Sequence, residues 1–520
     1  SRGIMITNLL RTPKWVIQKM VSSAGEDGSL STTTPRIKKQ NLPSRSKKDL
    51  KGRFSPKNPY FSRGVFTPSP LPKISTMKPK IAVIGTGPSG ITALKNLLDQ
   101  GLDAVAFDRN EAVGGNWIYS EKESHSSVFE TTHIISSKTL SQYEDFTFDD
   151  FEPNTADYPS HDTLRRYFQA YAERFNLLTH IQFDTLVTSC QRNPDGSWDV
   201  TTEKEGQSST ETYSHLVVAN GHHWKPRMPN YPGEFTGEFL HSHNFKKAAP
   251  FAGKRVLVIG GGNSACDVAV ETSRVSAFSA ISWRRGYNIV PKFLFGKPSD
   301  KVAEGTKWLP LAVRSFFNKL MLKVFVGDNS VYGLRPVTEA FGATHPTIND
   351  ELLHKIRHGK VSPRMDIASF EGKTVVFEDG RREDYDSIIA CTGYWLTHPF
   401  FEKELIDYST GPVPLYLKMF HPKLDNLYFI GMFQPLGCIW PGAELQSKLM
   451  AQELIGKWKR PKNLAALCEK EVTDPHYKQV NTPRHTITVD FHLFVKALKQ
   501  QLPKNYLSKK PIASTETVSA

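Results

Sequence analysis

The amino-acid sequence predicts an α/β protein built from two doubly wound, Rossmann-like domains, with the second domain inserted into a discontinuous first one. Two observations carry this prediction. Segments that start at Lys80 and Lys254 each run from a short apolar strand through closely spaced glycines into a helical pattern. Two further apolar strands end in a small residue before glycine, LVVANGHH at 216–223 and IIACTGYW at 388–395. We expect these two strands to mark the places where the chain crosses between the domains.

The first segment reads KIAVIGTGPSGITALKNLLDQGLDAVAFDRN, with an apolar strand at 81–84 and a second strand that ends at Asp108. Its glycines permit a tight turn, let the backbone approach a pyrophosphate and allow the helix to pack closely on the strand. Asp108 stands about 20 residues after the glycines, where an acidic side chain accepts hydrogen bonds from ribose hydroxyls. The first domain therefore suits a nucleotide with a free ribose diol.

The second segment reads KRVLVIGGGNSACDVAVETS and contains Gly260 and Gly262. Where the first segment has its acid, this one has Arg284 and Arg285. Guanidinium groups bind phosphate in a bidentate fork, whereas a carboxylate would repel a 2′-phosphate. The second domain therefore suits NADP. The alternative is that the two arginines form an ordinary solvated strand end.

These patterns divide the chain into segments of different character. The first domain is expected to comprise residues 78–225 and 355–460, and the second domain residues 226–354. A C-terminal extension follows at 461–520. Residues 1–77 are rich in Ser, Pro, Lys and Arg without a sustained apolar pattern, so they are expected to form a disordered basic leader.

The positive charge of the chain is concentrated in that leader. Residues 1–77 hold 15 of the 66 Lys and Arg residues and only 3 of the 52 Asp and Glu residues. The remaining residues carry 51 basic against 49 acidic side chains, which excludes a nucleic-acid-binding enzyme surface. The leader has the composition of an organelle transit peptide, which would direct the protein to a mitochondrion or plastid. Alternatively it is a dispensable extension before a start at Met77, and the protein is cytoplasmic.

Other classes of protein are excluded by what the chain lacks. No run of 18 apolar residues predicts a transmembrane helix, and residues 308–327 are interrupted by charges, so they predict an amphipathic helix. The five cysteines have neither metal nor disulfide spacing, and no metal site is expected. The Cys-x-x-Cys pair that a disulfide reductase needs beside its flavin is missing.

Between the two glycine-rich segments lies FTGEFLHSHNF at 235–245, with Phe235, Gly237, His241 and Phe245 in the order F-x-G-x-x-x-H-x-x-x-F. This order resembles the identifying motif of flavin-dependent monooxygenases. Its last aromatic residue is Phe, as in the N-hydroxylating and flavin-containing monooxygenases, whereas Baeyer–Villiger enzymes typically have Trp there. Further stretches resemble the flavin-containing monooxygenase family in the same order: GGNW (114–117), EDFTF (144–148), GGGNSACDVA (260–269), INDELLHKI (348–356), ACTGY (390–394) and FIGMFQPLGCIWPGAELQ (429–446).

The resemblance covers about residues 79 to 456 and implies two cofactors and a reaction. NADPH reduces FAD, O₂ adds to give a C4a-hydroperoxyflavin, and a soft nucleophilic nitrogen or sulfur of a small molecule takes one oxygen atom. The partners expected are this small molecule and O₂, with a homodimer left open. The residues that would hold FAD are Gly85, Gly87, Pro88, Ser89, Gly90, Asp108, Gly115 and Trp117, with Gln446 beside the flavin ring. Those that would hold NADPH are Gly260, Gly262, Asn263, Ser264, Arg284 and Arg285.

One position departs from the family. Many members have an Asn beside the flavin, three residues before a Lys, whereas this chain has Ile135 before Ser136, Ser137 and Lys138. Ile cannot donate a hydrogen bond, so either Ser136 or Ser137 acts as the catalytic donor, or the lifetime of the peroxyflavin and the choice of substrate differ from those of the better-known members. Two alternative functions of the protein remain open. The first is a Baeyer–Villiger monooxygenase, which shares the cofactor motifs, and the second is a flavoprotein that acts as an NADPH oxidase or a redox sensor.

Overall fold

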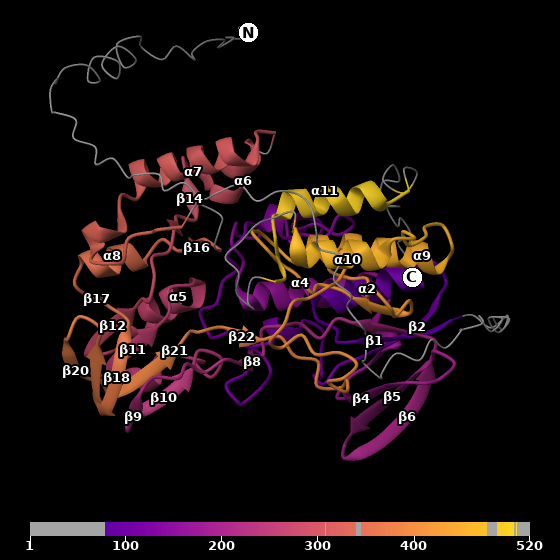
Figure 1. The fold of residues 1–520 in the computed structure, drawn as a ribbon, viewed down its shortest axis with the longest axis horizontal. Coiled ribbons are helices and arrows are strands. Elements are labelled where there is room, and N and C mark those ends of the chain that lie inside the picture. The colour runs from indigo at the N-terminus through magenta and orange to yellow at the C-terminus, as the bar shows by residue number, and fades with distance from the viewer. Residues whose placement is uncertain (1–78, 307, 340–344, 476–485, 504–505, 507–520) are drawn as a thin grey trace, which may run out of the picture. The chain divides into compact units, whose positions relative to one another are not determined.

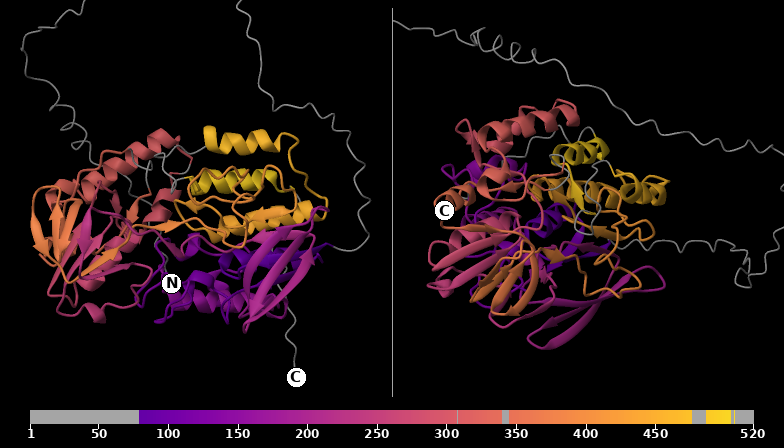
Figure 2. Two further views of the ribbon diagram at one scale, coloured as in Figure 1. Left: turned by 60° about the horizontal axis from the view of Figure 1, so that its bottom comes forward. Right: turned by 60° about the vertical axis from the view of Figure 1, so that its left-hand side comes forward.

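The computed structural model describes residues 79–306, 308–339, 345–475, 486–503 and 506. The predicted leader at 1–77 lies outside these residues. No helix among the described residues is long and apolar enough to cross a membrane. The described residues form one unit, in which two parallel sheets can be followed in Figures 1 and 2.

The first parallel sheet contains the first glycine-rich segment, and its strand order is β23-β7-β1-β2-β3. One face of the sheet packs on helices, because Ile81 and Val83 join a core with α2, α4 and α9. The other face, with Ala82 and Ile84, packs on a three-stranded antiparallel sheet. The strands are β1 (Lys80–Ile84), β2 (Asp103–Phe107), β3 (Ile181–Gln182), β7 (His215–Val218) and β23 (Leu427–Phe429), and the helices are α2 (Pro88–Leu98), α4 (His161–Arg174) and α9 (Trp440–Leu454).

The second parallel sheet has the order β10-β21-β11-β12-β17 and contains the second glycine-rich segment. Val256 and Val258 face the helix α5, whereas Leu257 and Ile259 face a four-stranded sheet on the opposite side. This alternation is typical of strands that are buried on both faces. The elements are β10 (Glu238–His241), β11 (Arg255–Ile259), α5 (Asn263–Thr272), β12 (Phe278–Ser282), β17 (Ser362–Arg364) and β21 (Ser387–Ala390).

Short elements cover and connect the two sheets. The antiparallel layers are β4 (Leu186–Arg192), β5 (Trp198–Lys204) and β6 (Gln207–Tyr213) on the first sheet, and β18 (Ile367–Gly372), β19 (Thr374–Phe377) and β20 (Arg382–Asp384) on the second. Strand β9 (Gly233–Phe235) pairs in parallel with β18 at the edge of the latter layer. The remaining short helices outside the insertion are η1 (Gly115–Trp117), η2 (Lys138–Leu140), α3 (Phe148–Phe151), η3 (Leu178–His180) and η4 (Ala249–Phe251).

The two crossings between the sheets lie side by side. After β7 the chain forms β8 (Lys225–Pro226), and after β21 it forms β22 (Tyr394–Trp395). These two short strands pair with each other in antiparallel fashion. The prediction that the second domain is inserted between LVVANGHH and IIACTGYW is therefore confirmed.

The predicted boundary at residue 355 is wrong. Strand β21 pairs with β10 on one side and β11 on the other, so the second sheet needs it as a central strand. Strand β17 pairs with β12 in the same sheet. Residues 362–390 therefore belong to the second domain, and the chain returns to the first domain only at 391–395.

The predicted C-terminal extension also needs correction, because its described part belongs to the core of the first domain. Strand β25 (Thr488–Val489) pairs in parallel with β24 (Gln434–Pro435). Helix α11 (Phe491–Gln501) buries Phe494 and Leu498 in the same core as α2 and α9. The other helix of this region is α10 (Leu464–Thr473).

An insertion lies between β12 and β17 of the second domain. Its helix α7 (Leu311–Phe325) confirms that a helix forms where one was predicted, at 308–327, and its apolar side chains Phe316, Val324 and Phe325 are exposed. Arg314 of α7 forms an ion pair of 2.6 Å with Asp490, the residue that caps α11. The other elements of the insertion are β13 (Ile289–Val290), β14 (Phe293–Leu294), β15 (Lys297–Pro298), α6 (Ser299–Glu304), η5 (Asn329–Tyr332), β16 (Thr347–Ile348) and α8 (Leu352–Arg357).

Candidate active site

Two positions at the turn between β1 and α2 require glycine. Gly85 has φ of +95°, and a Cβ there would lie 2.7 Å from the carbonyl oxygen of Ala219. A Cβ on Gly90 would lie 1.8 Å from the carbonyl oxygen of Gly85. The helix starts at Pro88 after the cap residue Gly87, without a side-chain cap and without an acid in its first turn. Such a helix start presents backbone N–H groups and a positive dipole end, which suits a pyrophosphate.

Asp108 lies at the end of β2, beside this turn. It is 6% exposed, and its carboxylate accepts hydrogen bonds from the backbone N–H of Thr86 (2.6 Å) and from that of Asn110 (2.9 Å). The hydroxyl of Thr86 donates a further bond of 2.8 Å. The carboxylate is thus held at the carboxyl edge of the sheet, where nucleotides bind in this class of fold.

The helix η1 packs against the same turn. Gly115 has φ of +54°, and a Cβ on it would lie 2.8 Å from the Cα of Gly87. Trp117 is partly buried, with its ring centroid 5.7 Å from that of Trp440 at the start of α9. The GGNW stretch thus lies beside the first glycine-rich turn.

The Gln446 amide is bonded to the main chain at both ends, and its place beside the flavin ring stays a prediction. Gln446 is fully buried, accepts a hydrogen bond from the N–H of Gly431 (2.9 Å) and donates one to the carbonyl oxygen of Leu417 (2.9 Å). Gly431 in turn lies against Ser89, since a Cβ on it would be 2.1 Å from the Ser89 Oγ. Gln446 therefore positions the loop that packs on the start of α2, and both ends of its amide are engaged by the backbone.

The second glycine-rich turn repeats the geometry of the first. Gly260 has φ of +127°, and a Cβ there would lie 2.7 Å from the carbonyl oxygen of Cys391. Gly262 caps α5 without a side-chain bond, and a Cβ on it would meet nothing within 4 Å. Ser264 is exposed in the first turn of α5, whereas Asn263 accepts a hydrogen bond from the N–H of Ile348 (2.7 Å). Asn263 thus ties the turn to the insertion.

Arg284 and Arg285 follow β12 at the same edge of the second sheet. Arg284 is exposed. The pKa of Arg227 is lowered, first because Arg227 is partly buried and second because the positive charge of Arg284 lies nearby. Arg285 stacks on the ring of Tyr287 at 5.2 Å, and its Nε is buried without a hydrogen-bond partner. Neither arginine forms an ion pair within the described part of the chain. Positive charges without carboxylate partners, next to an uncapped helix start, suit a phosphate group.

The F-x-G-x-x-x-H-x-x-x-F segment joins the two domains. His241 at the end of β10 is buried, with its ring 5.1 Å from that of Tyr394 in the returning crossing. His243 bonds through Nε2 to the carbonyl oxygen of Ser124 at 2.8 Å, and Lys246 donates to the carbonyl oxygen of Ser126 at 2.7 Å. The segment therefore attaches the second domain to a loop of the first.

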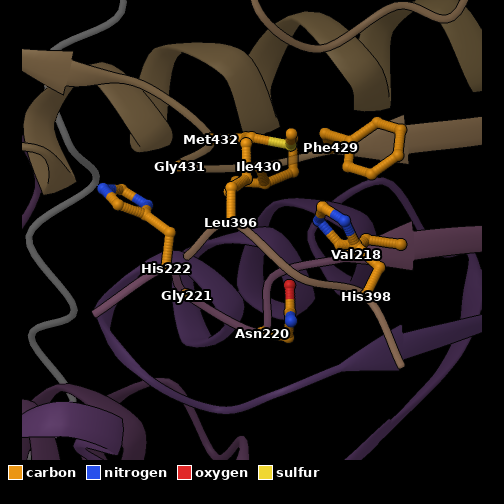
Figure 3. A pocket seen from close by; sticks show the side chains of 10 residues that line it. All are labelled: Val218, Asn220, Gly221, His222, Leu396, His398, Phe429, Ile430, Gly431 and Met432. Carbon is orange, nitrogen blue, oxygen red and sulfur yellow. The ribbon is translucent and has the colours of Figure 1, made fainter. Parts of the chain in front are cut away.

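A small cavity opens at the carboxyl edge of the first sheet, and Figure 3 shows its lining. Asn220 and His222 follow β7, His398 follows β22, and Gly431 follows β23. Burial lowers the pKa of His398 to about 3 and also lowers that of His222, so both imidazoles are neutral near pH 7. The Nδ1 of His398 is buried and has no hydrogen-bond partner among the described residues. The histidines therefore bring no charge to this cavity.

Both predicted catalytic serines are buried and have partners within the protein. The Ser136 hydroxyl lies 2.8 Å from that of Ser141, and the Ser137 hydroxyl lies 3.2 Å from that of Thr139. Ile135 is partly buried. The structure thus gives each hydroxyl a neighbour other than a ligand, and a catalytic role for either serine stays a prediction.

The structure brings together all the glycine, aspartate and arginine positions predicted for the two nucleotides, each at the carboxyl edge of its sheet, and these residues fit FAD and NADPH. The backbone approaches itself closely at Gly85, Gly90 and Gly260, so both turns take a shape that a Cβ at these positions would disrupt. Sequence reasoning missed three residues. His398 lines the cavity, Arg227 lies near Arg284, and the ring of Tyr287 lies under the guanidinium of Arg285. No signal in the sequence identifies these three residues, because none of them belongs to a recognised motif.

Comparisons with known proteins identify relatives of this chain. The family model described as flavin-binding monooxygenase-like matches residues 78–506. The chain is 36% identical over 437 residues to flavin-containing monooxygenase 5 of Rattus norvegicus, covering 80% of this chain and 81% of that protein. It is 33% identical over 453 residues to dimethylaniline monooxygenase (N-oxide-forming) 2 of Oryctolagus cuniculus, covering 83% and 81%.

Solved structures share the fold. S-allyl-L-cysteine S-oxygenase from Allium sativum matches with a TM-score of 0.63 at 22% identity, covering 82% of this chain and 88% of that one. An open structure of cyclohexanone monooxygenase matches with a TM-score of 0.61 at 18% identity, covering 81% and 97%. At these identities the likeness concerns the fold alone.

Proposed function

The chain belongs to the flavin-binding monooxygenase-like family, and from this premise we propose that it transfers one oxygen atom of O₂ to a nucleophilic nitrogen or sulfur of a small molecule. It is an FAD- and NADPH-dependent monooxygenase. The observation that carries the proposal is the pair of uncapped helix starts, one beside Asp108 and the other beside Arg284 and Arg285. This arrangement supports one nucleotide with a free ribose diol and one with a 2′-phosphate.

Each part of the site contributes a separate function. When bound, FAD supplies the electron transfer and oxygen activation that no protein side chain provides. The start of α2 and Asp108 would hold its pyrophosphate and ribose, and the start of α5 with the two arginines would hold NADPH. The neutral His222 and His398 leave the cavity uncharged. These residues bind and orient the reactants and limit the access of water.

The proposed substrates follow from the relatives. One relative is named as an N-oxide-forming dimethylaniline monooxygenase, so a tertiary amine is the first substrate class to test. A thioether is the second, because its sulfur is a comparable soft nucleophile. We also propose that the body of the protein does not bind nucleic acid and that the protein resides in the cytoplasm, with a mitochondrion or plastid as the alternative if residues 1–77 are a transit peptide. A homodimer stays open as its assembly.

The test is a panel of a tertiary amine, a thioether and a cyclic ketone, with NADPH consumption, oxygenated product and hydrogen peroxide measured together. We expect N-oxide or S-oxide formation to account for most of the NADPH consumed above the rate without substrate. Ester formation from the ketone alone would instead indicate a Baeyer–Villiger enzyme. Peroxide equal to all NADPH consumed, with no oxygenated product from any substrate, would indicate an oxidase.

Removal of the leader is expected to leave the enzyme intact. A protein that starts at Met77 should keep its melting temperature within about 2 °C and its turnover within about twofold, because low-hydrophobicity, highly charged segments contribute little packed core. Thermal unfolding and NADPH oxidation of the full chain and the shortened one measure this directly. A large drop in either quantity would show that residues 1–77 stabilise the body.

A further inference from the structure

A direct hydrogen bond connects the insertion of the second domain to the loop at 135–141 of the first. The backbone N–H of Ser137 donates to Oδ2 of Asp300 at 2.6 Å. Asp300 lies in the first turn of α6, and its other oxygen, Oδ1, accepts from the N–H of Lys301 at 2.7 Å. One carboxylate oxygen of Asp300 therefore accepts a hydrogen bond within its own helix, and the other accepts one from Ser137, 163 residues earlier in the sequence.

A second contact holds the same two regions together. The hydroxyl of Tyr158 donates to the carbonyl oxygen of Lys292 at 2.6 Å, and its ring meets that of Phe293 edge-on at 5.4 Å. The same carbonyl oxygen accepts the N–H of Ser299, the first residue of α6, at 2.8 Å. Lys292 thus connects Tyr158 of the first domain to α6, and Asp300 is fixed next to the loop it contacts.

On its other side, the loop leads to the FAD-binding turn. The hydroxyls of Ser136 and Ser141 bond to each other at 2.8 Å across the loop. Tyr143, which follows the loop, donates its hydroxyl to the carbonyl oxygen of Pro88 at 2.6 Å. Pro88 is the first residue of α2. A continuous path of contacts therefore runs from Asp300 to the helix start that receives the FAD pyrophosphate.

We propose that Asp300 is a positioning residue of the oxygenation reaction, because it holds the 135–141 loop of the FAD domain in place from the insertion of the NADP domain. This inference rests on the proposed function. A hydrogen bond from a backbone N–H to a carboxylate is stronger than one between neutral groups, so Asp300 fixes the loop more firmly than an uncharged side chain would. The insertion carries Asp300 and is also bonded to Asn263 of the NADP-binding turn, so it links the two cofactor sites.

The expected consequence concerns how NADPH oxidation is divided between two outcomes. In oxygenation, NADPH, a proton, O₂ and the substrate give NADP⁺, water and the oxygenated substrate. In the unproductive reaction, NADPH, a proton and O₂ give NADP⁺ and hydrogen peroxide. Both reactions take two electrons from NADPH, and they differ in whether one oxygen atom reaches the substrate. A loosened loop admits water near FAD and favours the second outcome.

The test compares Asp300→Ala with Asp300→Asn and Tyr158→Phe in the full chain loaded with FAD. With a tertiary amine present, we expect Asp300→Ala to raise the ratio of peroxide to oxygenated product about tenfold, as loss of one hydrogen bond to a charged group implies. The rate of flavin reduction by NADPH should stay within about twofold to threefold. Asp300→Asn keeps an oxygen acceptor for the Ser137 N–H, so it should restore most of the product. Tyr158→Phe should shift the ratio in the same direction by a smaller factor.

Asp328→Ala is the matched control, because Asp328 also accepts a backbone N–H, that of Ser330 at 2.8 Å, in the same insertion. It should leave the ratio of peroxide to product unchanged. An unchanged ratio in Asp300→Ala, even with a lower melting temperature, would overturn the proposal. If Asp300→Ala does not fold, an unchanged ratio in Tyr158→Phe overturns it instead. The proposed function is tested separately with the wild-type enzyme, because it fails if that enzyme oxygenates neither the tertiary amine nor the thioether.

Discussion

Replacement of Gly90 by alanine is expected to yield a protein that loses most of its bound FAD during purification. The added Cβ would lie 1.8 Å from the carbonyl oxygen and 2.8 Å from the carbonyl carbon of Gly85, and both atoms belong to the backbone of the turn. The turn must therefore shift. Overpacking of this kind costs about 1–3 kcal/mol, and a displaced turn no longer matches the pyrophosphate. The dissociation constant for FAD is expected to rise about 10- to 100-fold.

Gly101→Ala is the control for this substitution. Gly101 follows α2 and has φ of +67°, and a Cβ on it would meet nothing within 4 Å, so the substitution adds only local backbone strain. We expect it to cost about 1–2 kcal/mol of stability and to leave FAD affinity unchanged. Flavin absorbance of the purified proteins and titration of the apoproteins with FAD measure both effects. If Gly90→Ala binds one FAD per chain with the affinity of the wild-type protein, this turn does not form the flavin site.

Arg285→Ala is expected to weaken the use of NADPH about 10- to 150-fold in kcat/KM and to leave the use of NADH nearly unchanged. This range corresponds to about 1.5–3 kcal/mol for a hydrogen bond to a charged group. The structure supports the expectation because the Arg285 guanidinium stacks on Tyr287 with a buried, unpartnered Nε. Arg284→Ala should have a smaller effect in the same direction, since Arg284 is exposed.

Arg382→Ala provides the comparison, because Arg382 is also an exposed arginine of the second domain but pairs with Glu371 on the antiparallel layer. It should change the use of neither coenzyme. Steady-state rates with each coenzyme, together with NADP⁺ binding by titration, separate a loss of binding from a loss of turnover. Equal losses with NADPH and NADH in Arg285→Ala would mean that this residue does not contact the 2′-phosphate.

Both nucleotide-binding turns could be predicted from the sequence because they depend on local geometry. A positive φ at Gly85 and Gly260, and the close approach of Gly90 to the strand, are requirements that only glycine meets at those positions. The spacing of strand, glycines and helix then fixes where Asp108 and Arg285 lie. A motif confined to about 30 residues of chain therefore carries its own structure.

The predictions that failed depend on contacts between distant segments. Residues 362–390 join the second sheet because β21 fits between β10 and β11, which both lie far earlier in the chain. The bonds of the Gln446 amide to the backbone of Gly431 and Leu417 are likewise contacts between separate segments, and its place beside the flavin ring stays a prediction. Neither strand order nor the direction of a buried amide is specified by the local sequence.

The sequence by itself determined the two nucleotide sites, their order and the inserted domain, because backbone sterics and the 2-residue and 3.6-residue periods of strands and helices are local properties. Only the tertiary structure decided where the chain returns to the first domain and that α11 completes its core. It also decided which partner each buried polar group finds. Ser137 and Asp300 lie in separate domains and meet because these domains pack together, and the burial of apolar surface across the whole molecule drives that packing.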